Sequence, residues 1–107
     1  MSQGNDEGVD LDLIASCLVR FIREHVDDVS LRGLPLSEDS VKGRRVKEEE
    51  DLWFLGDWSI QGSPPRFEAL WSIDVAPGET VFVTVHIEKT VSGYQVLDWD
   101  VQQDIWE

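Results

Sequence analysis

The fold class follows from residues 67–87, which read Phe-Glu-Ala-Leu-Trp-Ser-Ile-Asp-Val-Ala-Pro-Gly-Glu-Thr-Val-Phe-Val-Thr-Val-His-Ile. Apolar residues alternate with other residues on both sides of Ala76-Pro-Gly-Glu79, as is typical of two half-buried strands. Proline presets φ and glycine tolerates positive φ, so the tetrapeptide predicts a turn. The stretch therefore predicts an antiparallel β-hairpin.

The register of this hairpin depends on the number of residues in its turn. A two-residue turn at Pro77-Gly78 would pair Ile73 with Phe82 and send Val81 to the opposite face. The two apolar patterns agree only if the loop has an odd number of residues or if a bulge intervenes. We expect the odd loop.

Alternation at period two continues on both sides of this hairpin. It predicts strands at about residues 52–61, 66–76, 80–89 and 94–101. Because the loops between successive strands are short, they predict a four-stranded antiparallel meander.

The N-terminal part of the chain has the periodicity of a helix. Apolar residues from Leu11 to Val29 recur at three- and four-residue steps, which predicts an amphipathic helix over about residues 10–28 with Asp10 as its N-cap. Residues 1–8 are predicted to be a frayed terminus, and residues 33–51 a charged loop with one short helical turn at Ser37-Glu-Asp-Ser40. Residues 9–107 thus form a single α+β domain, in which the helix packs on a curved sheet.

Composition excludes several classes of function. The chain has 107 residues, 22 acids and nine Lys and Arg, for a net charge of −13. Direct binding to a phosphate backbone needs a basic face, so no nucleic-acid partner is expected. The longest apolar stretch is far shorter than the roughly 20 residues of a membrane span. One cysteine, Cys17, and two separated histidines exclude an internal disulfide and a structural zinc site. We expect a cytoplasmic protein without a metal or cofactor.

The last predicted hairpin, Thr84-Val-His-Ile-Glu-Lys-Thr-Val-Ser-Gly-Tyr-Gln-Val-Leu-Asp98, resembles the closing hairpin of nuclear-transport-factor-like and cystatin-like rolls. Gly93 occupies the place of the turn glycine, and the aromatic, aliphatic and polar places that follow are taken by Tyr94, Val96 and Asp98. The resemblance implies a roll in which these three side chains point into the concave side.

The alternation within the last strand gives a different orientation. Counted from its apolar positions, Leu97, Trp99 and Val101 point inward instead. A bulge near Val96-Leu97 would reconcile the two orientations.

The sheet face opposite the predicted core combines aromatic residues with acids. Trp58 and Trp71 belong to the expected core face. Large apolar anchors surrounded by charge are typical of protein recognition, because the anchors dominate binding energy and complementary charge speeds encounter. The predicted partner-binding residues are Trp53, Leu55, Asp57, Glu68, Leu70, Asp74 and Phe82.

No catalytic motif is present, so the first hypothesis is a small acidic non-enzymatic binding protein. It would dock on or neutralise a basic partner protein, as immunity proteins and inhibitors do. The alternative is a pocket protein on the same roll, either a small-ligand carrier or a general-base enzyme. Its site would contain His86, Asp98, Asp100 and Tyr94. A homodimer formed through the sheet face is a third hypothesis.

Overall fold

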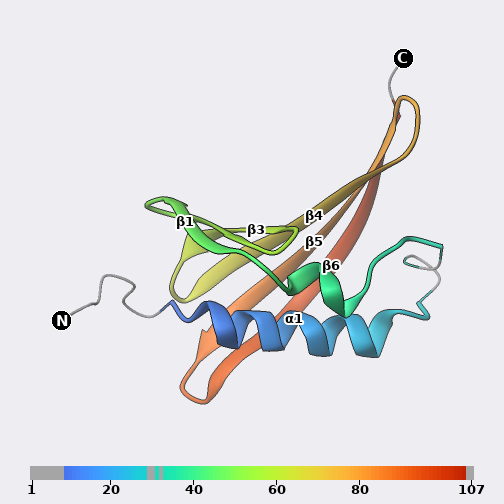
Figure 1. Cartoon of the computed structure of the whole chain (residues 1–107). Coiled ribbons are helices and arrows are strands. Elements are labelled where there is room, and N and C mark those ends of the chain that lie inside the picture. The colour runs from blue at the N-terminus through green and yellow to red at the C-terminus, as the bar shows by residue number, and fades with distance from the viewer. Residues whose placement is uncertain (1–8, 29–30, 32, 106–107) are drawn as a thin grey trace.

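The computed structural model describes residues 9–28, 31 and 33–105. These residues form one α-helix, one 3-10 turn and a single antiparallel sheet of six strands in chain order (Figure 1). The predicted frayed segment, residues 1–8, lies outside the described residues. The elements are α1 (Leu11–His25), η1 (Glu38–Val41), β1 (Arg45–Glu49), β2 (Leu52–Leu55), β3 (Trp58–Ser63), β4 (Arg66–Ala76), β5 (Glu79–Thr90) and β6 (Gly93–Ile105).

Helix α1 lies where the apolar periodicity predicts a helix, and it ends at His25. Asp10 caps it, because its Oδ1 accepts hydrogen bonds from the backbone N–H groups of Asp12 and Leu13 at 3.0 and 3.2 Å. Arg23 and His25 lie in the last turn, where a positive charge interacts favourably with the negative end of the helix dipole. The apolar side of α1 faces the sheet.

Residues 52–61 form parts of two strands rather than the single strand that we expected. A two-residue turn, Gly56-Asp57, reverses the chain, so that Leu55 pairs with Trp58. Cross-strand partners share a face of the sheet. Gly56 has φ 61°, and an added Cβ would lie 2.3 Å from the carbonyl oxygen of Ser40. Only glycine therefore fits this turn.

The expected charged loop contains η1, at the predicted helical turn, and also β1, which we did not predict. Every residue of β1 is exposed, so its sequence has no alternating apolar signal. The strand is paired along its length with β2. Two cations lie over aromatic rings of β2: Arg44 is 4.9 Å from the Phe54 ring centre, and Lys47 is 5.9 Å from that of Trp53.

The turn between β4 and β5 has two residues, and a bulge corrects the register. Ala76 pairs with Glu79 across Pro77-Gly78, while the register shift beside Asp74 leaves Val75 as the extra residue. Ile73 consequently pairs with Val81. The odd loop that we expected is therefore wrong, and the alternative, a bulge, is present.

A second bulge separates the two halves of β6. His86 pairs with Asp98 and Ile87 pairs with Val96, so Leu97 is the extra residue. Tyr94, Val96, Trp99 and Val101 all pack against the core as a result. The inward orientation that the resemblance implied for Asp98, and the one that alternation gave Leu97, are both wrong.

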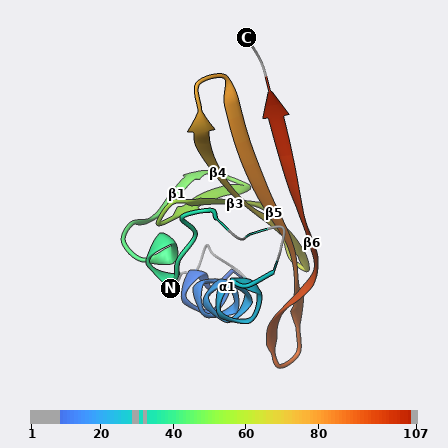
Figure 2. The same cartoon turned by 90° about the vertical axis from the view of Figure 1, so that its right-hand side faces the viewer.

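The core lies between α1 and one face of the sheet, which curves around the helix (Figure 2). Trp58 and Trp71 are both buried there, and the Trp58 indole N–H donates to the hydroxyl of Ser40 at 2.9 Å. The far ends of β4, β5 and β6 extend beyond the helix (Figure 1). Because α1 packs on the core face, none of the described residues forms an α-helix over the other face of these strands.

Candidate functional site

We call the side of β4, β5 and β6 that points away from α1 the outer face. Its side chains are exposed on β4 and β6 and half-buried on β5, except for the buried Thr80. The cross-strand rows that form this face are Arg66/Glu88/Gln95, Glu68/His86/Asp98, Leu70/Thr84/Asp100, Ser72/Phe82/Gln102 and Asp74/Thr80/Asp104.

The outer face is strongly acidic. Its rows contain six carboxylates and a single guanidinium, that of Arg66, which lies 3.3 Å from Glu88. Asp74 accepts a hydrogen bond from the Thr80 hydroxyl at 2.8 Å. Carboxylates in neighbouring rows repel one another, and a cationic surface placed against them would relieve that repulsion.

Apolar side chains lie among these acids. Leu70 is 38% exposed, and Phe82 is half-buried in the row next to the last one of the face. Leu97, the extra residue of the β6 bulge, is also exposed. The outer face thus offers apolar surface that a partner would bury inside a charged rim.

The structure places four of the seven predicted partner-binding residues on the outer face. These are Glu68, Leu70, Asp74 and Phe82.

The other three lie elsewhere, and for Trp53 and Leu55 the predicted face is wrong. They are 5% and 0% exposed and lie in the core, because the Gly56-Asp57 turn puts them on the same face as Trp58. Asp57 belongs to that turn, where its backbone N–H donates to the Ser40 carbonyl oxygen at 2.7 Å.

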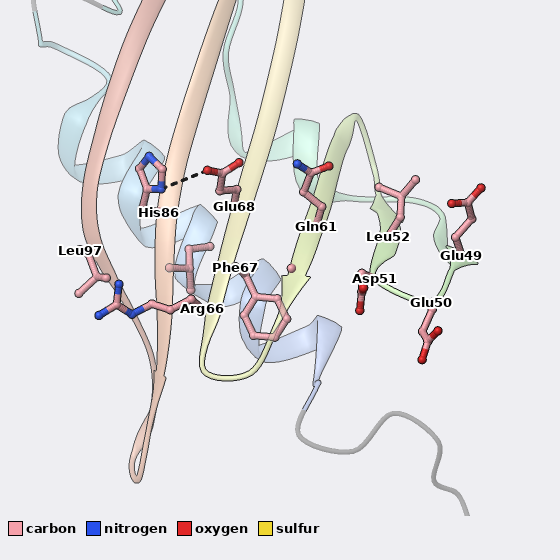
Figure 3. A pocket seen from close by; sticks show the side chains of 12 residues that line it. Glu49, Glu50, Asp51, Leu52, Gln61, Arg66, Phe67, Glu68, His86 and Leu97 are labelled. Carbon is pink, nitrogen blue, oxygen red and sulfur yellow. Dashed lines mark ion pairs between the residues drawn. The ribbon is translucent and has the colours of Figure 1, made fainter.

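His86 lies between two carboxylates on the outer face. Its Nδ1 is 3.7 Å from Glu68 Oε2 (Figure 3). Its Nε2 is 3.8 Å from Asp98 Oδ1. These distances are longer than hydrogen bonds. The side chain is 39% exposed and borders an open groove of about 650 Å³ that also contacts Asp51 and Leu52. The arrangement is a solvated charge cluster rather than an enclosed general-base site.

The residues of the alternative pocket do not come together. Tyr94 is on the helix side of the sheet, where its ring centre is 6.1 Å from that of Phe67 and its hydroxyl accepts from the Asp10 N–H at 3.1 Å. Asp100 pairs with Thr84, one row away from His86. The prediction of one site formed by all four residues is therefore wrong in its geometry.

Other candidate chemistry is sparse in the described part of the chain. Cys17 is buried on α1, and burial raises the pKa of its thiol, which disfavours the reactive thiolate. No cluster of three or more His, Cys, Asp or Glu side chains in residues 9–28, 31 and 33–105 is arranged to hold a metal ion. Nor does this part of the chain contain a helix of the length and apolarity needed to cross a membrane.

Sequence reasoning missed part of the acidic surface. Glu88, Asp98, Asp100 and Asp104 were not among the predicted partner-binding residues. The last strand was expected to end at residue 101, before Asp104. The even spacing of Asp98, Asp100 and Asp104 was a signal that these three side chains share one face of a longer strand.

Comparisons of the chain with protein-family models, with curated proteins and with solved structures find no match. The function must therefore be argued from the outer face itself.

Proposed function

We propose that this protein is a small acidic, non-enzymatic binding protein of the immunity-protein or inhibitor type. It docks on or neutralises a basic partner protein in the cytoplasm through the outer face. The observation that carries the proposal is the composition of that face, where six carboxylates and one paired guanidinium surround Leu70 and Phe82. Burial of the apolar side chains would supply affinity, and the carboxylates would steer a cationic partner into place.

The position of His86 favours binding over catalysis. A general base works best in a site that excludes water and holds its partner at hydrogen-bond distance. The imidazole instead borders an open groove, 3.7 and 3.8 Å from Glu68 and Asp98. In our proposal, Glu68 and Asp98 contribute negative charge to a contact surface that also contains His86.

We also propose that the fold is a variant of the cystatin-like or nuclear-transport-factor-like roll. The long last hairpin and the helix held by a curved antiparallel sheet support this assignment. The two additional strands are short: β2 has four residues and β1 has five.

The test compares two variants that each lose three negative charges. The outer-face variant carries Glu68→Gln, Asp98→Asn and Asp100→Asn. The control variant carries its substitutions on α1, on η1 and in the β2–β3 turn, at exposed positions away from the outer face: Glu24→Gln, Asp39→Asn and Asp57→Asn.

Each protein is used to capture partners from native lysate at low and at high salt, and captured proteins are identified by mass spectrometry. We expect wild type and control to retain the same basic protein at low salt, and the outer-face variant to retain at least about tenfold less of it. Affinities are then measured with that partner in purified form. Equal retention by both variants, or a retained set without a basic protein, would contradict the proposal.

A further inference from the structure

Strand β6 is one of the two edges of the sheet. It pairs with β5 on one side only (Figure 2). In an edge strand, alternate backbone N–H and C=O groups point away from the sheet. Among the described residues, no backbone hydrogen bond outside the helix and the strand ladders involves residues 98–105. The outward backbone groups of this part of β6 are therefore available to another strand.

The two edges of the sheet differ in how well they are protected. β1 has five residues, a register shift beside Lys47 and positively charged side chains, all of which discourage pairing with another chain. β6 has 13 residues, and from Asp98 to Ile105 it pairs with β5 without any shift. The unprotected edge of the sheet is therefore β6, the long and regular strand.

The side chains along this regular part of β6 define the chemistry of an added strand. Asp98, Asp100 and Asp104 point to the outer face. On the helix side, Val101 is half-buried and Ile105 is 69% exposed. A neighbouring strand would match both sides if basic side chains alternated with apolar ones.

We propose that β6 binds an extended segment of the basic partner as a seventh strand, in which Lys or Arg alternates with apolar residues. The inference rests on the proposed function and specifies how the partner is held. Backbone hydrogen bonds to β6 supply affinity, and the alternating side chains supply specificity. The basic side chains lie beside Asp98, Asp100 and Asp104.

A second copy of this chain would meet like charges on this edge in the registers centred on Asp100, Val101 and Gln102. Antiparallel pairing of two β6 strands about a two-fold axis at Val101 places Asp98 opposite Asp104 of the other copy. An axis at Gln102 places Asp100 opposite Asp104, and an axis at Asp100 places that residue opposite itself. Like charges directly opposite one another destabilise a sheet, so charge favours a cationic strand.

The probe is an acetylated and amidated octapeptide with four Lys-Val repeats. Two control peptides have the same sequence, with the backbone nitrogens methylated at every Lys in one and at every Val in the other. In an added strand only one of these two sets of N–H groups faces β6. We expect one methylated peptide to lose at least about tenfold in affinity while the other still binds.

Amide hydrogen exchange followed by NMR locates the contact. We expect the unmethylated peptide to slow exchange at alternate residues of 99–103 by at least about tenfold and to leave α1 unchanged. Asp100→Lys should weaken binding of this peptide at least about tenfold, and the matched variant Glu24→Lys on α1 should bind it as wild type does.

Several results would overturn strand addition. One is equal binding of all three peptides with spectral changes confined to Leu70, Phe82 and their neighbours, which would leave outer-face docking intact. Another is concentration-dependent protection of β6 in the protein alone, which would assign the edge to a second copy. Protection of β6 by the peptide, combined with a lysate capture that retains no basic protein, would instead retain strand addition and contradict the proposed function.

Discussion

The indole of Trp53 lies between β1 and the core. Its ring centre is 6.3 Å from that of Phe67, in an edge-to-face arrangement, and Lys47 covers its exposed side. Truncating a buried aromatic side chain removes these contacts and leaves a cavity. Side chains of the outer face other than Thr80 are exposed or half-buried, so truncating them removes fewer packing contacts.

Trp53→Ala should therefore lower the free energy of unfolding by about 3–5 kcal/mol. Phe82→Ala should lower it by less than half as much, since that side chain is half-buried on the outer face, and should weaken partner binding. Urea denaturation at several protein concentrations separates folding from any association. A larger loss for Phe82→Ala than for Trp53→Ala would contradict the assignment of faces.

Tyr94 gives a prediction about pH. Burial raises the pKa of its phenol, and the hydrogen bond from the Asp10 N–H opposes part of that rise. The folded state thus favours the neutral phenol. Its contribution to stability is complete below the pKa of about 10 in the unfolded chain, and is lost as the pH rises through the higher folded value.

The chain has a single tyrosine, so ultraviolet absorbance of tyrosinate reports this group alone. We expect it to titrate at higher pH in the folded protein than in urea. The stability difference between wild type and Tyr94→Phe should shift against wild type above about pH 10. An identical titration in the folded and unfolded protein would refute the prediction.

At the scale of elements, the β2–β3 turn is the part of the sheet least tolerant of change. Gly56 has positive φ and lies against the backbone of residues 40–42. A Cβ added to it would lie 2.3 Å from the Ser40 carbonyl oxygen. Gly43 also has positive φ, but a Cβ there would meet nothing within 4 Å. Both positions have positive φ and only Gly56 is crowded, so comparing the two separates the cost of positive φ from the cost of the steric contact.

Gly43→Ala should lower the free energy of unfolding by about 1–2 kcal/mol, which is the cost of positive φ alone. Gly56→Ala should lower it further, because the backbone of η1 must also move. Urea midpoints of the two variants provide the comparison. Equal losses would show that the contact between the turn and η1 is not rigid.

Elements were predictable from the sequence wherever burial imposes a period. The long strands β4 and β5 each bury one face, so their apolar residues alternate. Strand β1 buries no side chain, and pairing with β2 holds it in place, so its sequence carries no such signal. The conflict of parity within residues 94–101 did indicate a bulge, and Leu97 is its extra residue.

Errors about the candidate site came from turns rather than from strands. Gly56-Asp57 is a recognised two-residue hairpin signal, but the alternation on its two sides concealed it. A missed reversal moves every preceding side chain to the other face. Trp53 and Leu55 were misplaced for this reason, whereas Leu70 and Phe82, on long strands without such a reversal near them, were placed correctly.

For the whole molecule, the net charge of −13 should dominate the response to salt. Carboxylates on the outer face repel one another, and this repulsion is screened beyond about 10 Å at 0.1 M salt. The unfolding temperature should therefore rise as NaCl is increased from about 0.01 to 0.15 M.

The outer-face triple variant should show a smaller rise than wild type, because part of the repulsion has been removed. Choline chloride serves as the control for specific sodium binding. An unfolding temperature that falls with salt would mean that ion pairs such as Arg23–Glu38 outweigh the repulsion.

The strands lie in the sheet in the same order as they occur in the chain, and this order affects the folding kinetics. Every strand pairs with its neighbour along the chain, so each hairpin closes a short loop. Contact between α1 and β6 closes a long one, since the Asp10–Tyr94 hydrogen bond spans 84 residues. Loop-closure entropy then places the hairpins early on the folding pathway and the docking of α1 late. During synthesis α1 is made before β6, so the part of its apolar side that contacts β6 is covered only after that strand has been made.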